Sequence, residues 1–407
     1  MDSYLLISFA FGLFFIVATL VKYKEFFNPL SITFAQDWLL LSLIPLVTEF
    51  LTGLPYYSSE TASVYSFFSL HLYALGMLLG VICYKLFRKN NCSNENNTKF
   101  KKRSFGLLIL FYFFLFFIMI FNSPSGFDWI INSRAAYQNG RVGFGWLYVS
   151  LQLILVISLT ASILTSNQFN LSLLLKIIFI LFLAFFLGSK SYLIFLVLYS
   201  VVLYHFFVRK IPSSNLLFVF VFLLISLFMV IPIYGDFNFD AGLLTYFDHG
   251  YNYGLLGEGL ADNLDRGQFL LSAGWSYLPR TIFIDKPFVY GDVWLTELIS
   301  AGSADKGHTL GGPSITFYAL AFGLWGVLFS GLILSFISNH LYYSVVDTKN
   351  LFYTLLYIHI AIVPVIKHTP ILMAIFAFYI MAKFFSSGNS KVMEWTPTTL
   401  NGIKVRK

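Results

Sequence analysis

Residues 235–312 begin with GDFNFDAGLLTYFDHG and end with DKGHTLGG, and they form a polar stretch between two long apolar segments. This stretch contains thirteen of the 28 glycines and ten of the 19 acidic residues. Those acidic residues are Asp236, Asp240, Asp248, Glu258, Asp262, Asp265, Asp285, Asp292, Glu297 and Asp305. The fold must therefore place this loop in water and keep most of the remaining chain out of water.

The composition is typical of a membrane protein. Hydrophobic residues make up 58% of the chain and charged residues 11%, whereas soluble domains carry about 25% charged residues. This balance predicts an all-α polytopic membrane protein, with one integral membrane domain over residues 1–407. The net charge of +7 does not indicate nucleic-acid binding, because the positive residues lie in short loops between apolar segments. Cys83 and Cys92 form neither a metal-binding spacing nor a disulfide framework.

Eleven stretches approach the roughly 20 apolar residues that a membrane-spanning helix needs. They are residues 3–21, 31–53, 64–87, 104–122, 146–164, 170–187, 191–208, 214–234, 313–340, 351–366 and 370–386. The first stretch has no basic region before it and no small-residue cleavage site after it. We therefore expect a retained helix there and not a signal peptide.

The basic residues predict the orientation. The loop 88–103, RKNNCSNENNTKFKKR, is strongly basic, and the positive-inside rule places it in the cytoplasm. Alternation from this loop puts most of the 26 Lys and Arg residues on the cytoplasmic side. The N-terminus and the loop 235–312 are then periplasmic in a Gram-negative cell, and the C-terminus is cytoplasmic. Within the loop, amphipathic patterns predict short interfacial helices at 255–264, 268–278 and 293–301.

Basic residues on the predicted outer side are the first candidates for chemistry. Arg134 and Arg141 lie in the loop 123–145, and a guanidinium group matches the oxygens of a phosphate. Lys190 lies in the turn Gly188-Ser189-Lys190-Ser191, where the start of the next helix also favours an anion. The alternatives remain open, because both arginines could be solvated loop charges and Lys190 could extend to the membrane surface.

Further candidates lie inside the large loop. Arg280 follows the helix-stopping Pro279, and Lys286 either binds an anion or pairs with Asp285. His308, in the glycine-rich run before the ninth span, could move a proton or be an ordinary polar loop residue. The acids considered as general bases, or as plain surface carboxylates, are Asp248 beside His249, Glu258, Asp262 and Asp292.

Several other residues carry weaker expectations. Trp275, Tyr277 and Tyr290 suit the headgroup depth of a membrane. Asp37 and Glu49 are costly in an apolar span, although both lie toward segment ends. We expect His71 and His205 to bond to the backbone or to neighbours and not to bind a ligand.

Four motifs resemble a known family. They are Ser133-Arg134, the GSKS turn at 188–191, LPRTIFIDKP at 278–287 and HTLGGPSITFYALAFGLWG at 308–326, which contains Gly323-x-x-Gly326. The chain is similar here to the Wzy-type oligosaccharide repeat-unit polymerases of O-antigen and capsule. One departure is Lys190, where arginine is commoner in the family, so the charge is kept but the bidentate geometry is lost.

The resemblance implies a GT-C-type glycosyltransferase of the bacterial inner membrane. Such an enzyme would use undecaprenyl-diphosphate-linked oligosaccharides and would transfer the growing glycan to the non-reducing end of a new repeat unit. It would need no metal ion and no cofactor. Its partners would be membrane lipid and, in the same pathway, a chain-length regulator and a flippase.

The resemblance also assigns roles to the candidate residues. Cations are expected to hold the donor diphosphate and to stabilise charge on the leaving group. These cations are Arg134, Arg141, Lys190, Arg280 and Lys286. Arg280 is expected to act in catalysis in addition to binding the diphosphate. His308 or a loop acid such as Asp248 would take the proton from the acceptor hydroxyl. Trp275, Tyr277 and Tyr290 would stack on sugar faces.

Three alternatives remain. An O-antigen ligase has a similar architecture and the same donor but a different acceptor. A transporter or flippase would place charges along a central path in several spans, whereas this chain gathers them in one loop. A structural scaffold is disfavoured by the same concentration of charged groups on one face.

Overall fold

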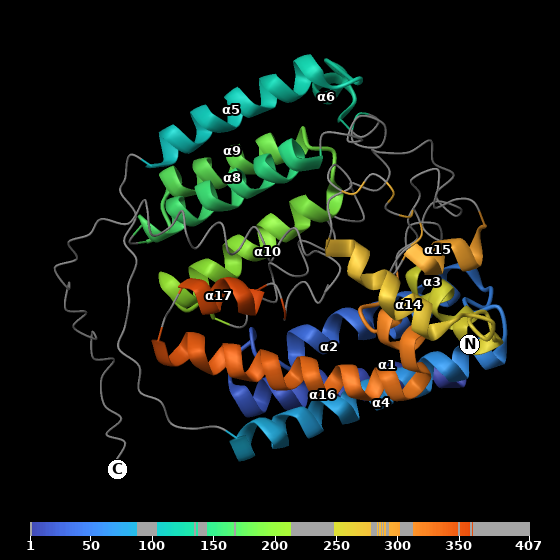
Figure 1. Ribbon diagram of the computed structural model, residues 1–407. Helices are drawn as coiled ribbons and strands as arrows, with labels where there is room; N and C mark the ends of the chain where they lie inside the picture. The colour runs from blue at the N-terminus through green and yellow to red at the C-terminus, as the bar shows by residue number, and fades with distance from the viewer. Residues whose placement is uncertain are drawn as a thin grey trace, which may run out of the picture.

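The computed structural model is helical throughout the residues that it describes, and no β-strand occurs among them (Figure 1). The described residues are 2–87, 104–133, 136, 145–166, 168–212, 248–277, 283, 285, 287, 289, 293–301, 312–348, 351–358 and 360. The all-α expectation is confirmed for this part of the chain. The long helices form two groups, and the short helices of the large loop lie at one end of them (Figure 1).

Six helices in the described part are long and apolar enough to cross a membrane: Ser3–Tyr23, Ser31–Phe50, Glu60–Phe87, Phe105–Asn122, Trp146–Leu164 and Thr316–Asp347. They coincide with six of the eleven predicted spans. Helices α9 (Leu171–Phe185), of 15 residues, and α10 (Lys190–Phe207), of 18 residues, occupy two further predicted spans. The spans predicted at 214–234 and 370–386 lie outside the described residues. Only part of the one at 351–366 is described, and it begins with α17 (Leu351–Tyr357).

The first group contains α1 (Ser3–Tyr23), α2 (Ser31–Trp38), α4 (Glu60–Phe87) and α16 (Thr316–Thr348). Small residues bring α4 and α16 together. A Cβ atom added to Gly76 would lie 2.1 Å from the carbonyl oxygen of Leu328, and one added to Gly331 would lie 2.4 Å from that of Tyr73. Ser335 Oγ also donates to Met77 O at 2.8 Å. This close backbone approach is the usual means by which helices associate in a membrane.

The second span is irregular. Helix α2 continues through a π-helical turn, η1 (Leu39–Leu43), into α3 (Ile44–Thr52). A π-helical turn widens the helix and leaves carbonyl groups available to other donors. Here Leu41 O accepts a hydrogen bond of 2.9 Å from the Tyr57 hydroxyl.

The second group contains α5 (Ser104–Asn122), α8 (Gly145–Leu164), α9, α10 and α17. Its core is largely aliphatic and aromatic, and two tyrosine hydroxyls form hydrogen bonds between its helices. Tyr112 OH donates to Leu183 O at 3.0 Å, and Tyr199 OH bonds to Thr160 Oγ1. The short helix α6 (Asp128–Ile131) follows α5.

Glu25 joins the two groups. Its carboxylate lies 2.8 Å from Lys210 Nζ and 3.3 Å from His205 Nε2, and it also accepts a hydrogen bond from Tyr342. Ile211 N donates to His205 Nδ1 at 3.1 Å, so the Nε2 atom carries the proton that faces Glu25. His205 therefore bonds to the backbone and a neighbour, as expected. His71 does the same, because its Nδ1 lies 2.8 Å from Phe67 O.

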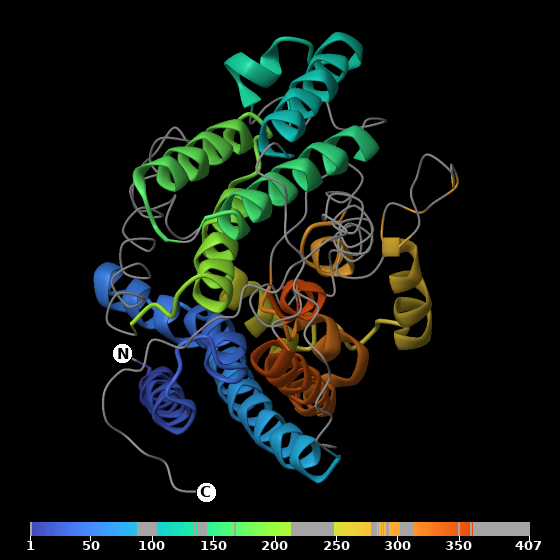
Figure 2. The ribbon, with the colours of Figure 1, turned by 90° about the vertical axis from the view of Figure 1, so that its left-hand side faces the viewer.

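The helix ends define two faces of the molecule. We call the end that carries Asp2, residues 53–60 and the helices of the large loop the loop face. The opposite end, which carries Glu25 and Lys210, is the basic face. Figure 1 shows α6 and the turn between α9 and α10 at the loop face, and Figure 2 views the molecule from the basic face.

The large loop contributes α13 (His249–Gly254), η2 (Leu255–Glu258), α14 (Arg266–Ala273), η3 (Gly274–Tyr277) and α15 (Val293–Ile299). The helix predicted at 293–301 is confirmed to within two residues, and the one predicted at 268–278 is found as α14 followed directly by η3. The one predicted at 255–264 is displaced toward the N-terminus. Gly259, with φ of 85°, ends η2, and turns follow where helix was expected.

Helix α16 differs from the predicted span 313–340, because it runs to Thr348 and is broken at Gly323. Gly323 has φ of 62° and ψ of −148°, a backbone conformation that is essentially restricted to glycine. The first turns of α16 therefore run in a different direction from the rest of the helix. The break falls at the first glycine of the Gly323-x-x-Gly326 motif.

Candidate functional site

Helix α13 is packed into the membrane-spanning group at the loop face. Gly250, Tyr253 and Gly254 are buried, and the helix contacts η1, α3 and α4. A Cβ atom on Gly250 would lie 2.3 Å from Leu40 O, so the loop backbone rests directly on the π-helical turn. The Tyr56 hydroxyl accepts a hydrogen bond of 3.1 Å from Tyr251 N. The sequence predicted an interfacial helix at 255–264, whereas α13, which precedes that range, is fixed against the second and third spans.

Asp248 stands at the start of this fixed helix. Its side chain is 27% exposed, and its Oδ1 lies 3.8 Å from His249 Nδ1. Burial raises the pKa of Asp248, and the neighbouring Asn252 and His249 lower it only in part. A carboxylate with a raised pKa is a better proton acceptor than an ordinary surface carboxylate. Among the predicted general bases that the structure describes, Asp248 has the environment closest to that task.

Two other described acids of the loop have structural partners. Glu258 accepts hydrogen bonds from Ser58 Oγ at 2.7 Å and from Ser59, and these bonds lower its pKa. Asp265 caps α14 by accepting from Gly267 N and Gln268 N. Glu258 therefore anchors the loop to the segment before α4, and Asp265 stabilises a helix end.

Asp37 carries the most buried charge near the loop. It is fully buried within the second span, and its two carboxylate oxygens accept from Ser314 N at 2.7 Å and from Ser314 Oγ at 2.6 Å. Ser314 lies between the large loop and α16. A buried carboxylate in a membrane span is costly unless it is hydrogen-bonded. Asp37 therefore fixes the point at which the loop enters α16.

The structure places some of the predicted site residues. Asp248 lies at the loop face. Trp275 lies in η3, half-buried, with its ring centroid 6.2 Å from that of Phe283. The backbone of Lys190 begins α10 at the loop face, and the backbone of Tyr277 ends η3. The remaining predicted residues lie outside the described part: Arg134, Arg141, Arg280, Lys286, Tyr290, Asp292 and His308.

Sequence reasoning missed three features. Ser314, the hydrogen-bond partner of Asp37, is 277 residues away, and the charge of Asp37 did not indicate which residue would bond to it. The Glu25 cluster also joins distant segments. The third feature, Gly76-x-x-x-Gly80 in the third span, carried a usable signal, because small residues four apart mark a close helix contact in membranes.

Comparison with known proteins supports the resemblance given by the motifs. The chain is 26% identical over 307 residues to proteins named O-antigen polymerase from Salmonella typhimurium (strain LT2) and Salmonella typhi. Each match covers 70% of this chain and 72% of the relative. No family model and no solved structure matches the chain. The resemblance to O-antigen polymerases is thus confirmed by similarity that extends well beyond the motifs.

Proposed function

We propose that this protein is a GT-C-type membrane glycosyltransferase that polymerises undecaprenyl-diphosphate-linked repeat units of O-antigen or capsule. The similarity to proteins named O-antigen polymerase carries the proposal. The loop face is the proposed site of reaction and lies in the periplasm, with the protein in the inner membrane. It gathers Asp248, the start of α10 and the described helices of the large loop.

In the proposed reaction, the oxygen of an acceptor hydroxyl attacks the anomeric carbon of the donor glycan. The bond from that carbon to the diphosphate oxygen breaks, and undecaprenyl diphosphate leaves with the electron pair. Asp248 or His308 takes the hydroxyl proton. Asp248 is favoured for this role by its raised pKa and by the fixed position of α13.

The charge that develops on the diphosphate needs stabilisation in the transition state. Arg134, Arg141, Lys190, Arg280 and Lys286 are proposed to supply it without a metal ion. Helix α6, which precedes Arg134 in the chain, and the start of α10 at Lys190 both lie at the loop face, which supports the proposal that these two cations act on that face (Figure 1). Trp275, Tyr277 and Tyr290 are proposed to contact the sugars.

The first prediction concerns these cations. In a strain that lacks the native gene, the wild-type chain should restore long-chain lipopolysaccharide. Arg134→Ala and Arg280→Ala should each lower polymerisation about a hundredfold or more, because each removes a charge that acts in the transition state. Gel analysis of lipopolysaccharide, with immunoblots for protein level, measures the effect.

The same strain separates the competing functions. Loss of a polymerase leaves lipopolysaccharide with one repeat unit, whereas loss of a ligase leaves bare core. Loss of a flippase would keep the lipid-linked repeat units in the cytoplasmic leaflet. Full-length polymer from both arginine variants would show that these cations do not hold the diphosphate.

A further inference from the structure

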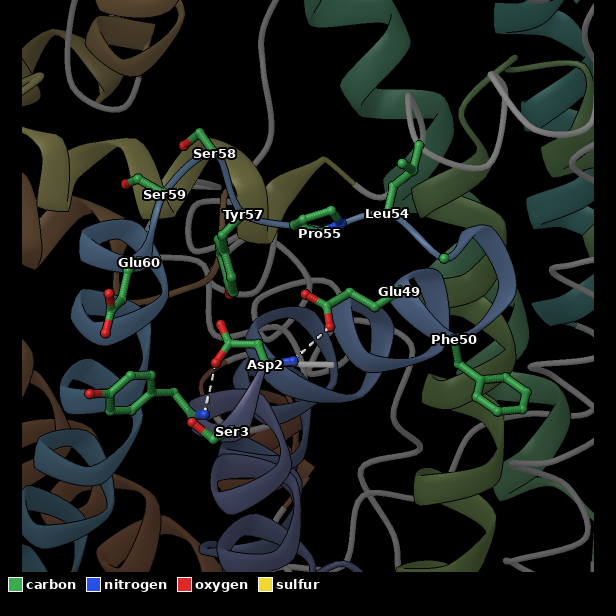
Figure 3. Close-up of a pocket in the computed structure, with 12 residues that line it drawn as sticks. Asp2, Ser3, Glu49, Phe50, Leu54, Pro55, Tyr57, Ser58, Ser59 and Glu60 are labelled. Carbon is green, nitrogen blue, oxygen red and sulfur yellow. Dashed lines mark hydrogen bonds between the residues drawn. The ribbon is translucent and has the colours of Figure 1, made fainter.

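A cavity of about 740 Å³ opens at the loop face where α1, α3 and α4 meet (Figure 3). Its size is within the range of about 300–1,000 Å³ that is usual for small-molecule sites. Its lining combines carboxylates, hydroxyls and apolar side chains, with Asp2, Glu49 and Glu60 supplying the acids. Tyr4, Tyr57 and Pro55 contribute ring surfaces.

Two of the carboxylates are held in place by the fold. Asp2 accepts hydrogen bonds from Tyr4 N at 2.8 Å and from Ser63 Oγ, and Glu49 accepts from Asp2 N at 3.1 Å and from Tyr56 N at 3.2 Å. Figure 3 shows the Glu49 carboxylate beside the backbone nitrogen of Asp2, and the Asp2 carboxylate on the side of Asp2 away from Glu49. An ionised carboxylate offers about four lone-pair sites. Each group thus keeps acceptor capacity beyond these two bonds.

The charge of the lining selects among possible ligands. Carboxylates repel a diphosphate and the anionic headgroup of a lipid. No group of three His, Cys, Asp or Glu side chains among the described residues is arranged to hold a metal ion. Sugar hydroxyls are neutral donors that suit fixed carboxylates, and the ring surfaces suit the less polar faces of a sugar. The chemistry therefore fits an uncharged, hydroxyl-rich ligand.

The large loop forms part of the surroundings of this cavity. Ser58 and Ser59 line the cavity, and both donate hydrogen bonds to Glu258 of η2. Tyr57 also lines the cavity, and its ring packs edge-on against that of Tyr56. The Tyr56 hydroxyl in turn accepts a hydrogen bond from Tyr251 N in α13, the helix that follows Asp248. One short segment, residues 56–59, thus connects the cavity wall to the helix that carries the proposed base.

We propose that this cavity binds the sugar portion of a lipid-linked oligosaccharide and leaves the diphosphate to the cations elsewhere on the loop face. This inference rests on the proposed function. It adds a binding site on α1, α3 and α4, none of which carries a residue of the proposed catalytic set. The opposite charges of the two sites would orient a substrate that is anionic at one end and neutral at the other.

The test uses the full chain in lipid nanodiscs and two probes. The first probe is the cell's own repeat-unit oligosaccharide, freed from its diphosphate by mild acid, and the second is inorganic pyrophosphate. Glu60→Gln removes one exposed carboxylate from the lining. Ser3→Trp places a large side chain at the cavity wall. We expect each variant to weaken oligosaccharide binding about tenfold or more, since each removes or blocks charge-assisted hydrogen bonds. Pyrophosphate binding should not weaken.

Matched variants serve as controls. Asp128→Asn removes an exposed carboxylate from α6 at the same face, and Ile7→Trp places the same large side chain one turn further along α1. Neither residue lines the cavity, so both should bind the oligosaccharide as the wild type does. Thermal unfolding of all four variants checks that each one is folded.

The outcomes separate this inference from the proposed function. If the wild type polymerises lipid-linked repeat units but Glu60→Gln and Ser3→Trp bind the free oligosaccharide normally, the cavity assignment is wrong and the function stands. If Ca²⁺ binds at Glu60 and the oligosaccharide does not, the assignment is also wrong. If the wild type forms no polymer from its lipid-linked units, the proposed function fails and the inference fails with it.

Discussion

At the scale of single residues, Glu25 controls how the two helix groups are joined. Burial of its carboxyl raises the pKa, but hydrogen bonds from His205, Lys210 and Tyr342 outweigh burial and lower the pKa to about 2. A carboxyl whose pKa is lowered by folding stabilises the folded state above its ordinary pKa. That stabilisation is lost as the pH falls from about 4.5 to about 2.

The pH dependence of stability follows from this. The wild type should lose on the order of 3 kcal/mol from this group across that pH range. Glu25→Gln should be less stable than the wild type at pH 7 and should show a flatter decline below pH 4.5. Thermal unfolding in detergent as a function of pH measures both effects. Glu60→Gln changes an exposed carboxyl group and is the control. If the stability of Glu25→Gln fell as steeply with pH as that of the wild type, the role of Glu25 would be contradicted.

The same scale shows what a single sequence can and cannot predict about polar residues. A charge inside an apolar stretch was visible for Asp37, and so was its cost. The partner, Ser314, could not be found because the pairing depends on how the second span and α16 meet. Asp248 was one of several candidate acids, and only the packing of α13 distinguishes it from the anchored Glu258 and the helix cap Asp265.

At the scale of elements, the pair α4 and α16 depends on three glycines. A Cβ atom at Gly76, Gly80 or Gly331 would lie within 2.4 Å of a backbone oxygen of the other helix. Gly76→Leu should force the helices apart and destabilise the protein by about 1–3 kcal/mol or more. The melting temperature in detergent, monitored by size-exclusion chromatography, measures this loss. Gly106→Leu in α5 is the control, because a Cβ atom there meets nothing within 4 Å. Equal stability of the two variants would show that the close approach is not needed.

Elements also divide into those that hydropathy predicts and those that it does not. Long apolar runs gave six spans in the right places, because about 20 apolar residues have few stable alternatives to a membrane helix. The π-helical turn at Leu39–Leu43 and the break at Gly323 left no trace in hydropathy. The π-helical turn lies against Gly250 of the large loop, and the break at Gly323 depends on a backbone angle.

At the scale of the whole molecule, the described cations are distributed unequally between the two faces. The basic face has Lys22, Lys24, Lys85, Arg209 and Lys210 near helix ends. At the loop face the described part of the chain has Arg266 and the backbone of Lys190. Cytoplasmic loops carry an excess of Lys and Arg. The fold and the positive-inside rule together therefore predict a periplasmic loop face.

A pair of reporter fusions tests this orientation. A phosphatase that is active only outside the cytoplasm, fused after Gly267, should be active, because this position lies in α14 at the loop face. The same reporter fused after Lys210, beside Glu25 at the basic face, should be inactive. The two fusions differ in the face that they report and share the helices before residue 210. Activity after Lys210 together with inactivity after Gly267 would invert the molecule. It would also place the proposed base and the cavity in the cytoplasm, where a periplasmic polymerase could not use them.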